Sequence, residues 1–370
     1  MIPVNEPHMP EHALGYVEDC ITTGWVSSAG AYIDKFEKSF AHYFQVPHAV
    51  TVSNGTTALH VAIAALGIGP GDEVIIPDLT IISCALAVHY TGAVPVVVDV
   101  EKTTGNINPA LIEAAISKKT KAIMVVHLYG HPVDMDPILA IAKKHHLFVI
   151  EDAAEAHGAL YKGKPVGGLG DVGCFSFYGN KIVTTGEGGM VITHSDTLDG
   201  KLRLLKDLAH IPGKRFYHAE VGYNYRMTNL QAALGLAGME EIDWAIEKKR
   251  HMAQIYTEGL SDYRYLELPT EADYARSVYW MYAITVSPRS PISKDEVRAK
   301  LKELGVDTRD YFVPIHEQPV FLSRGYFSGV SCPVASDLSR RGFYIPSGLA
   351  ITDSQQNDVI GAIHTIFSHV

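Results

Sequence analysis

The sequence predicts an α/β fold in which a mostly parallel sheet is covered by helices, followed by a smaller α+β domain. Short apolar runs alternate with helical stretches through the first two-thirds of the chain, and the pattern changes after about Trp244. Such alternation is typical of a parallel sheet with crossover helices. Several of the apolar runs have no polar face, as expected for strands that are covered on both sides.

The individual elements follow from these runs. The predicted strands of the large domain are short: Ala49–Ser53, Glu73–Pro77, Val94–Val98, Ala122–His127, Phe148–Glu151, Val172–Ser176 and Gly189–Thr193. The predicted helices are Pro10–Thr22, Thr57–Leu66, Ile81–Thr91, Pro109–Ala115, Met135–His145 and Asn229–Lys249. After them we expect a charged helix to about Leu260, a strand at Tyr279–Val286, a helix at Lys294–Leu304 and a last helix from Asp353. We therefore expect a large domain over residues 1–245 and a small C-terminal domain over residues 246–370.

Composition narrows the class of protein. The 370 residues are 47% hydrophobic, which is enough for a sizeable core. The formal net charge of -10, without a basic run, argues against nucleic acid or a membrane surface as a partner. The sequence shows neither a signal pattern nor an apolar run of membrane-spanning length. The four widely spaced cysteines suggest neither a disulfide framework nor a zinc site, so we expect a reduced, cytoplasmic protein with no metal.

Lys181 stands out because of the residues around it. An aromatic strand, a Gly-Asn turn and a glycine-rich return enclose it in Gly173-Cys-Phe-Ser-Phe-Tyr-Gly-Asn-Lys-Ile-Val-Thr-Thr-Gly-Glu-Gly-Gly189. Burial lowers the pKa of a lysine and makes its neutral amine available as a nucleophile for Schiff-base chemistry. We therefore expect one reactive amine in a dry, shaped site.

Asp152 is the predicted counterpart of that amine. It ends the apolar run Leu147-Phe-Val-Ile-Glu-Asp152, and the carboxyl ends of such strands are where α/β sheets bind ligands. A lysine and an aspartate are the pair that pyridoxal 5'-phosphate requires, because the lysine binds the cofactor aldehyde and the aspartate keeps the pyridine nitrogen protonated. The two residues together indicate a pyridoxal phosphate enzyme.

A phosphate site is predicted where Ser53-Asn-Gly-Thr-Thr57 joins a strand to a helix. Gly55 permits close approach of the backbone, and Thr56 and Thr57 offer hydroxyls beside free N–H groups at the positive end of the helix. The alternative is an ordinary capped turn. The Tyr223-Asn-Tyr-Arg-Met-Thr-Asn229 segment also has two interpretations, because Thr228 can simply cap the helix or Asn229 can belong to a binding site.

Two further glycine-rich patterns resemble nucleotide-binding motifs but lack the neighbouring element or residue that each motif requires. Gly168-Leu-Gly-Asp-Val-Gly173 fits the spacing of a dinucleotide-binding motif, but it precedes a strand and does not open a helix. Gly158-Ala-Leu-Tyr-Lys-Gly-Lys164 resembles a phosphate-binding loop, but Pro165 stands where a serine or threonine is needed. We expect a hairpin turn at the second segment.

The motifs taken together resemble the DegT-type nucleotide-sugar aminotransferases of pyridoxal phosphate fold type I. The matching segments run through the large domain in order: Gly24-Trp-Val-Ser-Ser28, Ser53-Asn-Gly-Thr-Thr-Ala-Leu-His60, Gly67-Ile-Gly-Pro-Gly-Asp-Glu-Val-Ile-Ile-Pro77, Val126-His-Leu-Tyr-Gly130, Glu151-Asp-Ala-Ala-Glu-Ala-His-Gly158, Phe175-Ser-Phe-Tyr-Gly-Asn-Lys181, Gly186-Glu-Gly-Gly-Met190 and Gly222-Tyr-Asn-Tyr-Arg-Met-Thr-Asn229. Tyr279-Trp-Met-Tyr282 and Thr308-Arg-Asp-Tyr-Phe-Val-Pro-Ile-His316 match in the small domain.

The resemblance implies a role for each matching residue. Lys181 would form the Schiff base with the cofactor, and Asp152 would pair with its pyridine nitrogen. The other implied cofactor contacts are Gly55, Thr56 and Ser176 at the phosphate, Glu155 near the phenolic oxygen, and Asn229 reaching the phosphate from the other subunit of a homodimer. Arg309, Tyr311 and His316 would contact the nucleotide sugar.

The resemblance also implies a reaction and one departure from the family pattern. The glutamate at position 155 resembles the branch of the family that aminates a GDP-linked 4-keto-6-deoxy sugar, with glutamate as the amino donor. This resemblance implies a cytoplasmic step in the biosynthesis of the O-antigen of lipopolysaccharide. Relatives often carry an aromatic residue after the threonine of Pro77-Asp-Leu-Thr80, stacked on the cofactor ring, whereas this chain has Ile81. We expect an apolar contact there and a less tightly held cofactor.

Three alternatives remain open at this point. The substrate could be a 3-keto sugar or carry another nucleotide. A sugar dehydratase of the same fold is a second alternative, but that branch has a histidine in place of the lysine. A binding protein without catalysis is the third, and the intact pair of Lys181 and Asp152 argues against it.

Overall fold

The computed structural model describes residues 1–211, 213–218 and 220–368. Its central element is a seven-stranded sheet with the order β1-β9-β8-β5-β4-β2-β3. The strands are β1 (His48–Val52), β2 (Glu73–Pro77), β3 (Val94–Val98), β4 (Thr120–Val126), β5 (Phe148–Asp152), β8 (Val172–Ser176) and β9 (Gly189–Thr193). The pairs from β3 through β8 are parallel, and β9 is antiparallel to both of its neighbours. The predicted mostly parallel sheet is confirmed.

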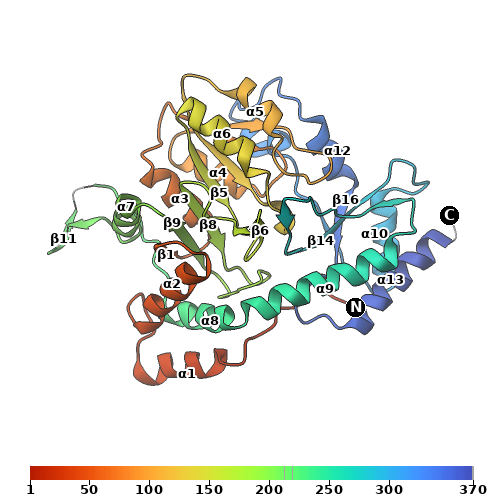
Figure 1. Cartoon of the computed structure of the whole chain (residues 1–370), viewed down its shortest axis with the longest axis horizontal. Helices are drawn as coiled ribbons and strands as arrows, with labels where there is room; N and C mark the ends of the chain where they lie inside the picture. Colours follow the sequence, from red (N-terminus) through yellow and green to blue (C-terminus); the bar gives the residue numbers. More distant parts are fainter. Residues whose placement is uncertain (212, 219, 369–370) are drawn as a thin grey trace.

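Helices cover the sheet on both sides (Figure 1). Those of the N-terminal part are α1 (Ala13–Thr23), α2 (Ala31–Tyr43), α3 (Gly55–Ala65), α4 (Ser83–Tyr90), α5 (Pro109–Ala115), α6 (Met135–His145), α7 (Asp196–Lys206), α8 (Asn229–Glu240) and the short turn η1 (Leu128–Gly130). Strands β2, β4 and β5 are buried almost throughout, so the apolar runs that predicted them reflect packing on both faces.

Two small sheets flank the central one. The hairpin of β6 (Leu160–Tyr161) and β7 (Lys164–Pro165), expected from sequence, is present, and β13 (Ala275–Arg276) pairs with β6. A second hairpin, β10 (His210–Ile211) and β11 (Lys214–His218), projects from the molecule beyond α7 (Figure 1). Neither small sheet extends the central sheet.

The C-terminal part forms an antiparallel sheet with its own helices. Its order is β12-β14-β16-β15, from β12 (Leu266–Glu267), β14 (Tyr282–Val286), β15 (Arg309–Asp310) and β16 (Gly342–Ile345). Its helical elements are α9 (Ile242–Leu260), α10 (Lys294–Glu303), η2 (Ile315–Glu317), α11 (Pro319–Leu322), α12 (Pro333–Arg341) and α13 (Asp353–Ser368). The predicted α+β character of this part is confirmed.

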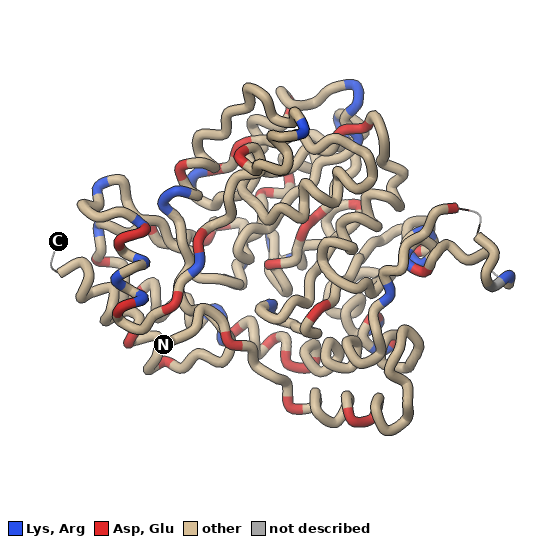
Figure 2. The backbone as a smooth tube through the Cα atoms, turned by 180° about the vertical axis from the view of Figure 1, so that it is seen from behind, with Lys and Arg blue, Asp and Glu red and all other residues tan. Residues whose placement is uncertain are grey.

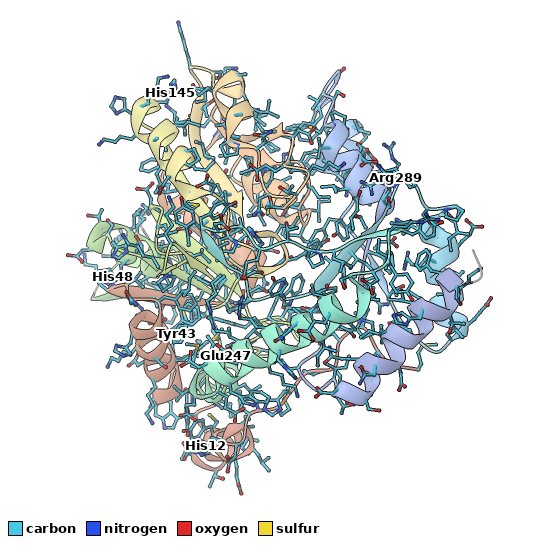
Figure 3. The ribbon with its side chains drawn as sticks, turned by 45° about the vertical axis from the view of Figure 1, so that its right-hand side comes forward. His12, Tyr43, His48, His145, Glu247 and Arg289 are labelled. Atoms are coloured by element: carbon cyan, nitrogen blue, oxygen red, sulfur yellow. The ribbon has the colours of Figure 1, made fainter. Side chains whose placement is uncertain are left out.

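Helix α9 joins the two parts of the molecule (Figure 1). Its first turns pack with the large hydrophobic cluster through Ala245 and Ile246, and its last turns pack with a second cluster in the C-terminal part. At the first end, Tyr43 of α2 donates a hydrogen bond to Asp243 of α9 at 2.9 Å, and Figure 3 shows Glu247 one turn further along. The predicted domain boundary at 245/246 falls inside this helix and stays a prediction.

Two predicted elements need correction. The single helix expected at Asn229–Lys249 is two helices, because the backbone leaves helical geometry at Glu241 (φ -112°). The carboxylate of Glu241 is held there by the ring of His8 at 2.8 Å and the backbone N–H of Glu11 at 2.7 Å. The strand expected from Tyr279 begins only at Tyr282, because Tyr279 has a left-handed φ of 46°.

Charge is spread over the chain surface. Figure 2 shows lysine and arginine interspersed with aspartate and glutamate and no continuous basic stretch along the part of the backbone that the structure describes. Among the described helices, none combines the length and the apolar character that a membrane span requires.

Candidate active site

A cavity of about 590 Å³ opens at the carboxyl ends of β5 and β8. Ligands of open α/β sheets bind at this edge. The cavity is lined by residues of the large part and by three aromatic side chains from the C-terminal part: Asn54, Gly55, Thr56, Thr57, Leu59, Ile81, Ser83, Val126, Asp152, Ala154, Glu155, Cys174, Ser176, Tyr178, Asn180, Lys181, Glu187, Trp280, Phe312 and Tyr344. All cofactor contacts predicted from sequence except Asn229 are among them.

Lys181 presents its amine to this cavity. It follows β8 in the Gly-Asn turn, and its Nζ lies 3.6 Å from the centre of the Trp280 ring. Burial lowers the pKa of Lys181, while the carboxylates of Glu155 and Asp152 act in the opposite direction. The side chain is half-buried and lines the cavity, so the amine is partly shielded from bulk water and yet accessible to a ligand.

Asp152 ends β5 and is almost completely buried. One carboxylate oxygen, Oδ1, accepts a hydrogen bond from the backbone N–H of Ala154 at 3.0 Å, and Oδ2 accepts one from the Cys84 thiol at 3.1 Å. Burial raises the pKa of Asp152, and these two bonds and the charge of Lys181 oppose that rise. The carboxylate is therefore fixed in orientation and poorly solvated, which favours a cationic partner in the cavity.

Glu155 is the second buried carboxylate of the cavity. Its Oε2 accepts a hydrogen bond from the backbone N–H of Tyr129 at 2.7 Å. That N–H is aimed at the carboxylate by an unusual backbone, because Tyr129 has a left-handed φ of 52°. Burial raises the pKa of Glu155, and the nearby Lys181 amine opposes that rise. Glu155 can therefore exchange a proton near neutral pH with a group in the cavity.

The N-terminus of α3 forms one wall of the cavity. Asn54 caps the helix by accepting from the N–H of Thr57 at 2.9 Å, so the ordinary capping interpretation is correct for this residue. A side chain at Gly55 would place its Cβ 2.8 Å from the Cβ of Ser176, so only glycine permits this close approach. The hydroxyl of Thr56 lies 3.0 Å from that of Ser83. The wall offers N–H groups, hydroxyls and a helix dipole to an anion.

The donor set fits a phosphorylated pyridine aldehyde. The α3 terminus suits a phosphate, the desolvated Asp152 carboxylate suits a protonated ring nitrogen, and the Lys181 amine suits an aldehyde. Asn180 adds a buried side-chain oxygen that lines the cavity and has no hydrogen-bond partner within the described structure. These groups are what pyridoxal phosphate requires.

Asn229 lies outside this cavity in its own chain. Its Oδ1 accepts from the N–H of Tyr32 at 3.0 Å, and its Nδ2 donates to the carbonyl of Trp25 at 2.7 Å. The residue is 1% exposed, and a side chain at Gly30 would collide with it. Within this chain the amide joins the loop at 25–30 to the first turn of α2, and its predicted reach to a partner's phosphate stays a prediction.

The three predicted substrate contacts also lie outside the cavity. Arg309 is exposed and pairs with Asp307 at 2.8 Å. Tyr311 lines a separate cavity of about 360 Å³ and packs against Tyr129. Nδ1 of His316 lies 2.6 Å from Oδ2 of the buried Asp78 carboxylate, which also accepts from the backbone N–H of His316 at 2.9 Å. His316 therefore ties the C-terminal loop to the residue that follows β2, and the contact of all three residues with a substrate stays a prediction.

Sequence reasoning missed the aromatic side of the cavity. Trp280, Phe312 and Tyr344 come from the C-terminal part and line the cavity opposite the sheet. Trp280 and Phe312 lie inside segments that match the family, but no role was predicted for either residue. Ile81 lines the cavity and is 38% exposed, so the apolar contact expected there is available.

Comparison with known proteins identifies the class of enzyme. Residues 7–364 match the DegT/DnrJ/EryC1/StrS aminotransferase family, and the chain belongs to this family. It is 43% identical to a GDP-perosamine synthase of Caulobacter vibrioides over 366 residues, covering 99% of this chain and 98% of that protein. It is likewise 43% identical over 367 residues to a GDP-perosamine synthase of Escherichia coli O157:H7, covering 99% of each chain.

A solved structure gives the same answer for the fold. The X-ray structure of an aminotransferase from Psychrobacter cryohalolentis matches with a TM-score of 0.94 and 34% identity, over 100% of both chains. The predicted fold type and the predicted aminotransferase class are confirmed. Aminotransferases of this family depend on pyridoxal phosphate, so the predicted cofactor is confirmed as well.

Proposed function

We propose that this aminotransferase transfers an amino group from glutamate to the C4 ketone of a GDP-linked 4-keto-6-deoxy sugar, with GDP-4-keto-6-deoxymannose as substrate and GDP-perosamine as product. The substrate assignment is supported by similarity over nearly the full length to three GDP-perosamine synthases, at 39% to 43% identity. We place the reaction in the cytoplasm, in the biosynthesis of the O-antigen of lipopolysaccharide.

One observation carries the catalytic part of this proposal: the Lys181 amine and the Asp152 carboxylate face one cavity at the carboxyl end of the sheet. Pyridoxal phosphate, when bound, supplies an aldehyde carbon that takes up amines and a pyridinium ring that accepts electrons. We assign Lys181 as the residue that holds the cofactor covalently between turnovers. We assign the N-terminus of α3 with Gly55, Thr56 and Ser176 as the phosphate site.

Lys181 also carries the proton transfer. Its amine lies beneath the Trp280 ring, with a pKa that burial lowers. When not bound to the cofactor, this amine would be placed to hold and move a proton of the Cα atom of the amino acid, a role that contributes roughly 10²–10⁴ in rate. The Glu155 carboxylate interacts electrostatically with both Lys181 and Asp152.

Asp152 holds the proton on the pyridine nitrogen. The backbone N–H of Ala154 and the Cys84 thiol fix the carboxylate in one orientation, so no reorganisation is needed when charge develops. The low-dielectric surroundings strengthen its attraction for a pyridinium cation. The carboxylate would thereby keep the ring in its electron-accepting form.

The test is a direct assay of regiochemistry. The purified protein, loaded with pyridoxal phosphate, is incubated with glutamate and GDP-4-keto-6-deoxymannose, and the product is analysed by mass spectrometry and NMR. We expect a product with nitrogen on C4. UDP- and dTDP-linked 4-keto sugars and a 3-keto sugar serve as comparisons. Nitrogen on C3, or faster turnover of another nucleotide, would overturn the substrate assignment and leave the aminotransferase class unaffected.

We also infer that two copies of the chain share their active sites. Tyr178 lines the cavity and is 51% exposed, and the loop held by Asn229 exposes Trp25, which is 58% exposed. A partner that covered these side chains would complete the cavity wall. Mixing Asn229→Ala with Lys181→Ala subunits tests this inference. Recovered activity in the mixture supports shared sites, and verified subunit exchange without recovery contradicts a role for Asn229 across the interface.

A further inference from the structure

Lys249 is a buried lysine without an acidic partner among the described residues. It lies on α9 and is 2% exposed, and desolvation is the influence that lowers its pKa, to about 7. Its amine donates hydrogen bonds to two backbone carbonyls, that of Trp280 at 2.6 Å and that of Ser347. Buried lysines are rare unless they are paired, and an unpaired one lowers stability. A buried lysine at this position therefore needs an explanation from its hydrogen bonds.

The first carbonyl belongs to the residue that covers Lys181. Trp280 is 3% exposed, its ring lies over the Lys181 amine, and its Nε1 donates to the carbonyl of Asn180 at 2.8 Å. The indole therefore touches both the reactive lysine and the turn that carries it. Its backbone carbonyl, two residues before β14, lies outside the strand ladder and is held by Lys249.

The second carbonyl marks the point where two strands meet. Ser347 follows β16 and is fully buried, its Oγ accepts from the N–H of Tyr282 at 2.9 Å, and that Oγ donates to the carbonyl of Ile345 at 2.6 Å. Lys249 thus joins the start of β14 to the end of β16. Tyr344 of β16 lines the cavity as well. The Lys249 amine therefore fixes the segments that carry Trp280 and Tyr344, two of the three aromatic side chains that the C-terminal part contributes to the cavity.

We propose that Lys249 is a positioning residue for catalysis: it anchors the Trp280 carbonyl so that the indole keeps the Lys181 amine aimed into the cavity and away from water. The proposal rests on the role assigned to Lys181 under the proposed function. A lysine suits this position because two backbone carbonyls need a donor there, and a buried carbonyl without one is costly. An apolar side chain of equal length could fill the space but could not hold the backbone.

The test is a double-mutant cycle on the full-length protein. The variants are Lys249→Met, Trp280→Leu and both together, with Lys248→Met on the same helix as the matched control. Two measurements do not depend on turnover: the rate at which the protein freed of cofactor takes up pyridoxal phosphate, followed by absorbance, and the rate at which Lys181 is acetylated by acetic anhydride, followed by peptide mass spectrometry. Thermal unfolding is recorded for every variant.

We expect Lys249→Met and Trp280→Leu each to change both Lys181 rates by about tenfold, and the double variant to add less than about twofold, because residues acting through one contact are not additive. Lys248→Met should match wild type. A folded Lys249→Met variant with wild-type Lys181 rates, even one of lower stability, would overturn the positioning role, as would effects that multiply in the double variant.

A further variant protects the test against misfolding. Lys249→Gln keeps N–H donors and should recover part of both rates; if Lys249→Met does not fold, Lys249→Gln takes its place in the cycle under the same criteria. Failure of the positioning role is distinguishable from failure of the proposed function. Wild-type protein that takes up cofactor at Lys181 preserves the proposed function whatever the variants do, whereas wild-type protein that takes up none contradicts both.

Discussion

Lys181 is half-buried and Lys249 is 2% exposed, and the two lysines differ in what surrounds the amine. Lys181 opens onto a cavity and is close to two carboxylates, those of Glu155 and Asp152. Lys249 reaches from α9 to the start of β14 and the end of β16, and its amine meets only backbone carbonyls among the described contacts. Burial lowers the pKa of both.

The difference shows that burial alone does not tell whether a lysine is catalytic or structural. A lowered pKa makes an amine available for chemistry only if a reactant can reach it, and the cavity provides that access for Lys181 alone. The same desolvation at Lys249 is compensated by hydrogen bonds that fix the backbone. A perturbed lysine therefore indicates an active site when cavity, carboxylates and access coincide, and a structural or positioning role when they do not.

The largest expected effect on turnover is that of Lys181→Ala. We expect turnover to fall by at least about 10⁴-fold, since both the covalent hold on the cofactor and the proton transfer are lost. The fold should survive, because the side chain borders a cavity. Turnover of GDP-4-keto-6-deoxymannose and circular dichroism check these outcomes. Retained activity would remove Lys181 from its assigned role.

Asp152→Asn tests the carboxylate that distinguishes the Lys181 site. A neutral amide does not stabilise a pyridinium charge in a low-dielectric site, so both half-reactions should slow by about 10²-fold or more while cofactor stays bound. Single-turnover rates with glutamate, and separately with the keto sugar, measure the effect. Rates within about tenfold of wild type would contradict the electron-accepting role assigned through this residue.

Lys249→Met should change the pH dependence of stability. The pKa of Lys249 is about 7 in the folded protein and 10.5 in its ordinary state, so between these values the unfolded chain binds more protons. Stability then rises with pH across this window, by up to about 5 kcal/mol at roughly 1.4 kcal/mol per pKa unit. Denaturant unfolding at pH 7, 8.5 and 10 should show wild type gaining stability relative to Lys249→Met. A constant difference would mean that Lys249 titrates normally.

The two lysines were not equally visible in the sequence. The glycines and aromatic residues next to Lys181 in sequence indicated a turn after a strand, and Asp152 ended an apolar strand. Both residues could therefore be placed at the edge of the sheet. Lys249 lies in a charged helix where the sequence gives no sign of burial. Its surroundings come from Trp280 and Ser347, which are 31 and 98 residues away along the chain.

The same distinction explains the remaining predictions. Strands with apolar residues on both faces were predicted nearly to the residue, because local composition reflects their burial. The break at Glu241 was not predictable, because His8 and Glu11, far away in sequence, bind its carboxylate. For His316 the motif was recognised, but its ring pairs with Asp78, a partner 238 residues away that local sequence does not reveal.

Cys84→Ala should have the smallest effect, because it removes only one of the hydrogen bonds to the carboxylate that distinguishes the Lys181 site. The thiol of Cys84 is fully buried and donates one of two hydrogen bonds to Asp152, the other coming from the backbone N–H of Ala154. Loss of one such bond, worth about 0.5–1.5 kcal/mol, should slow single turnovers by about two- to tenfold while Asp152 keeps its position. Cys332→Ala, at a buried cysteine that does not line the cavity, controls for loss of packing. Equal rates for Cys84→Ala and wild type would show that the backbone N–H alone orients the carboxylate, whereas a loss approaching that of Asp152→Asn would mean that the thiol bond is essential to the electron-accepting site.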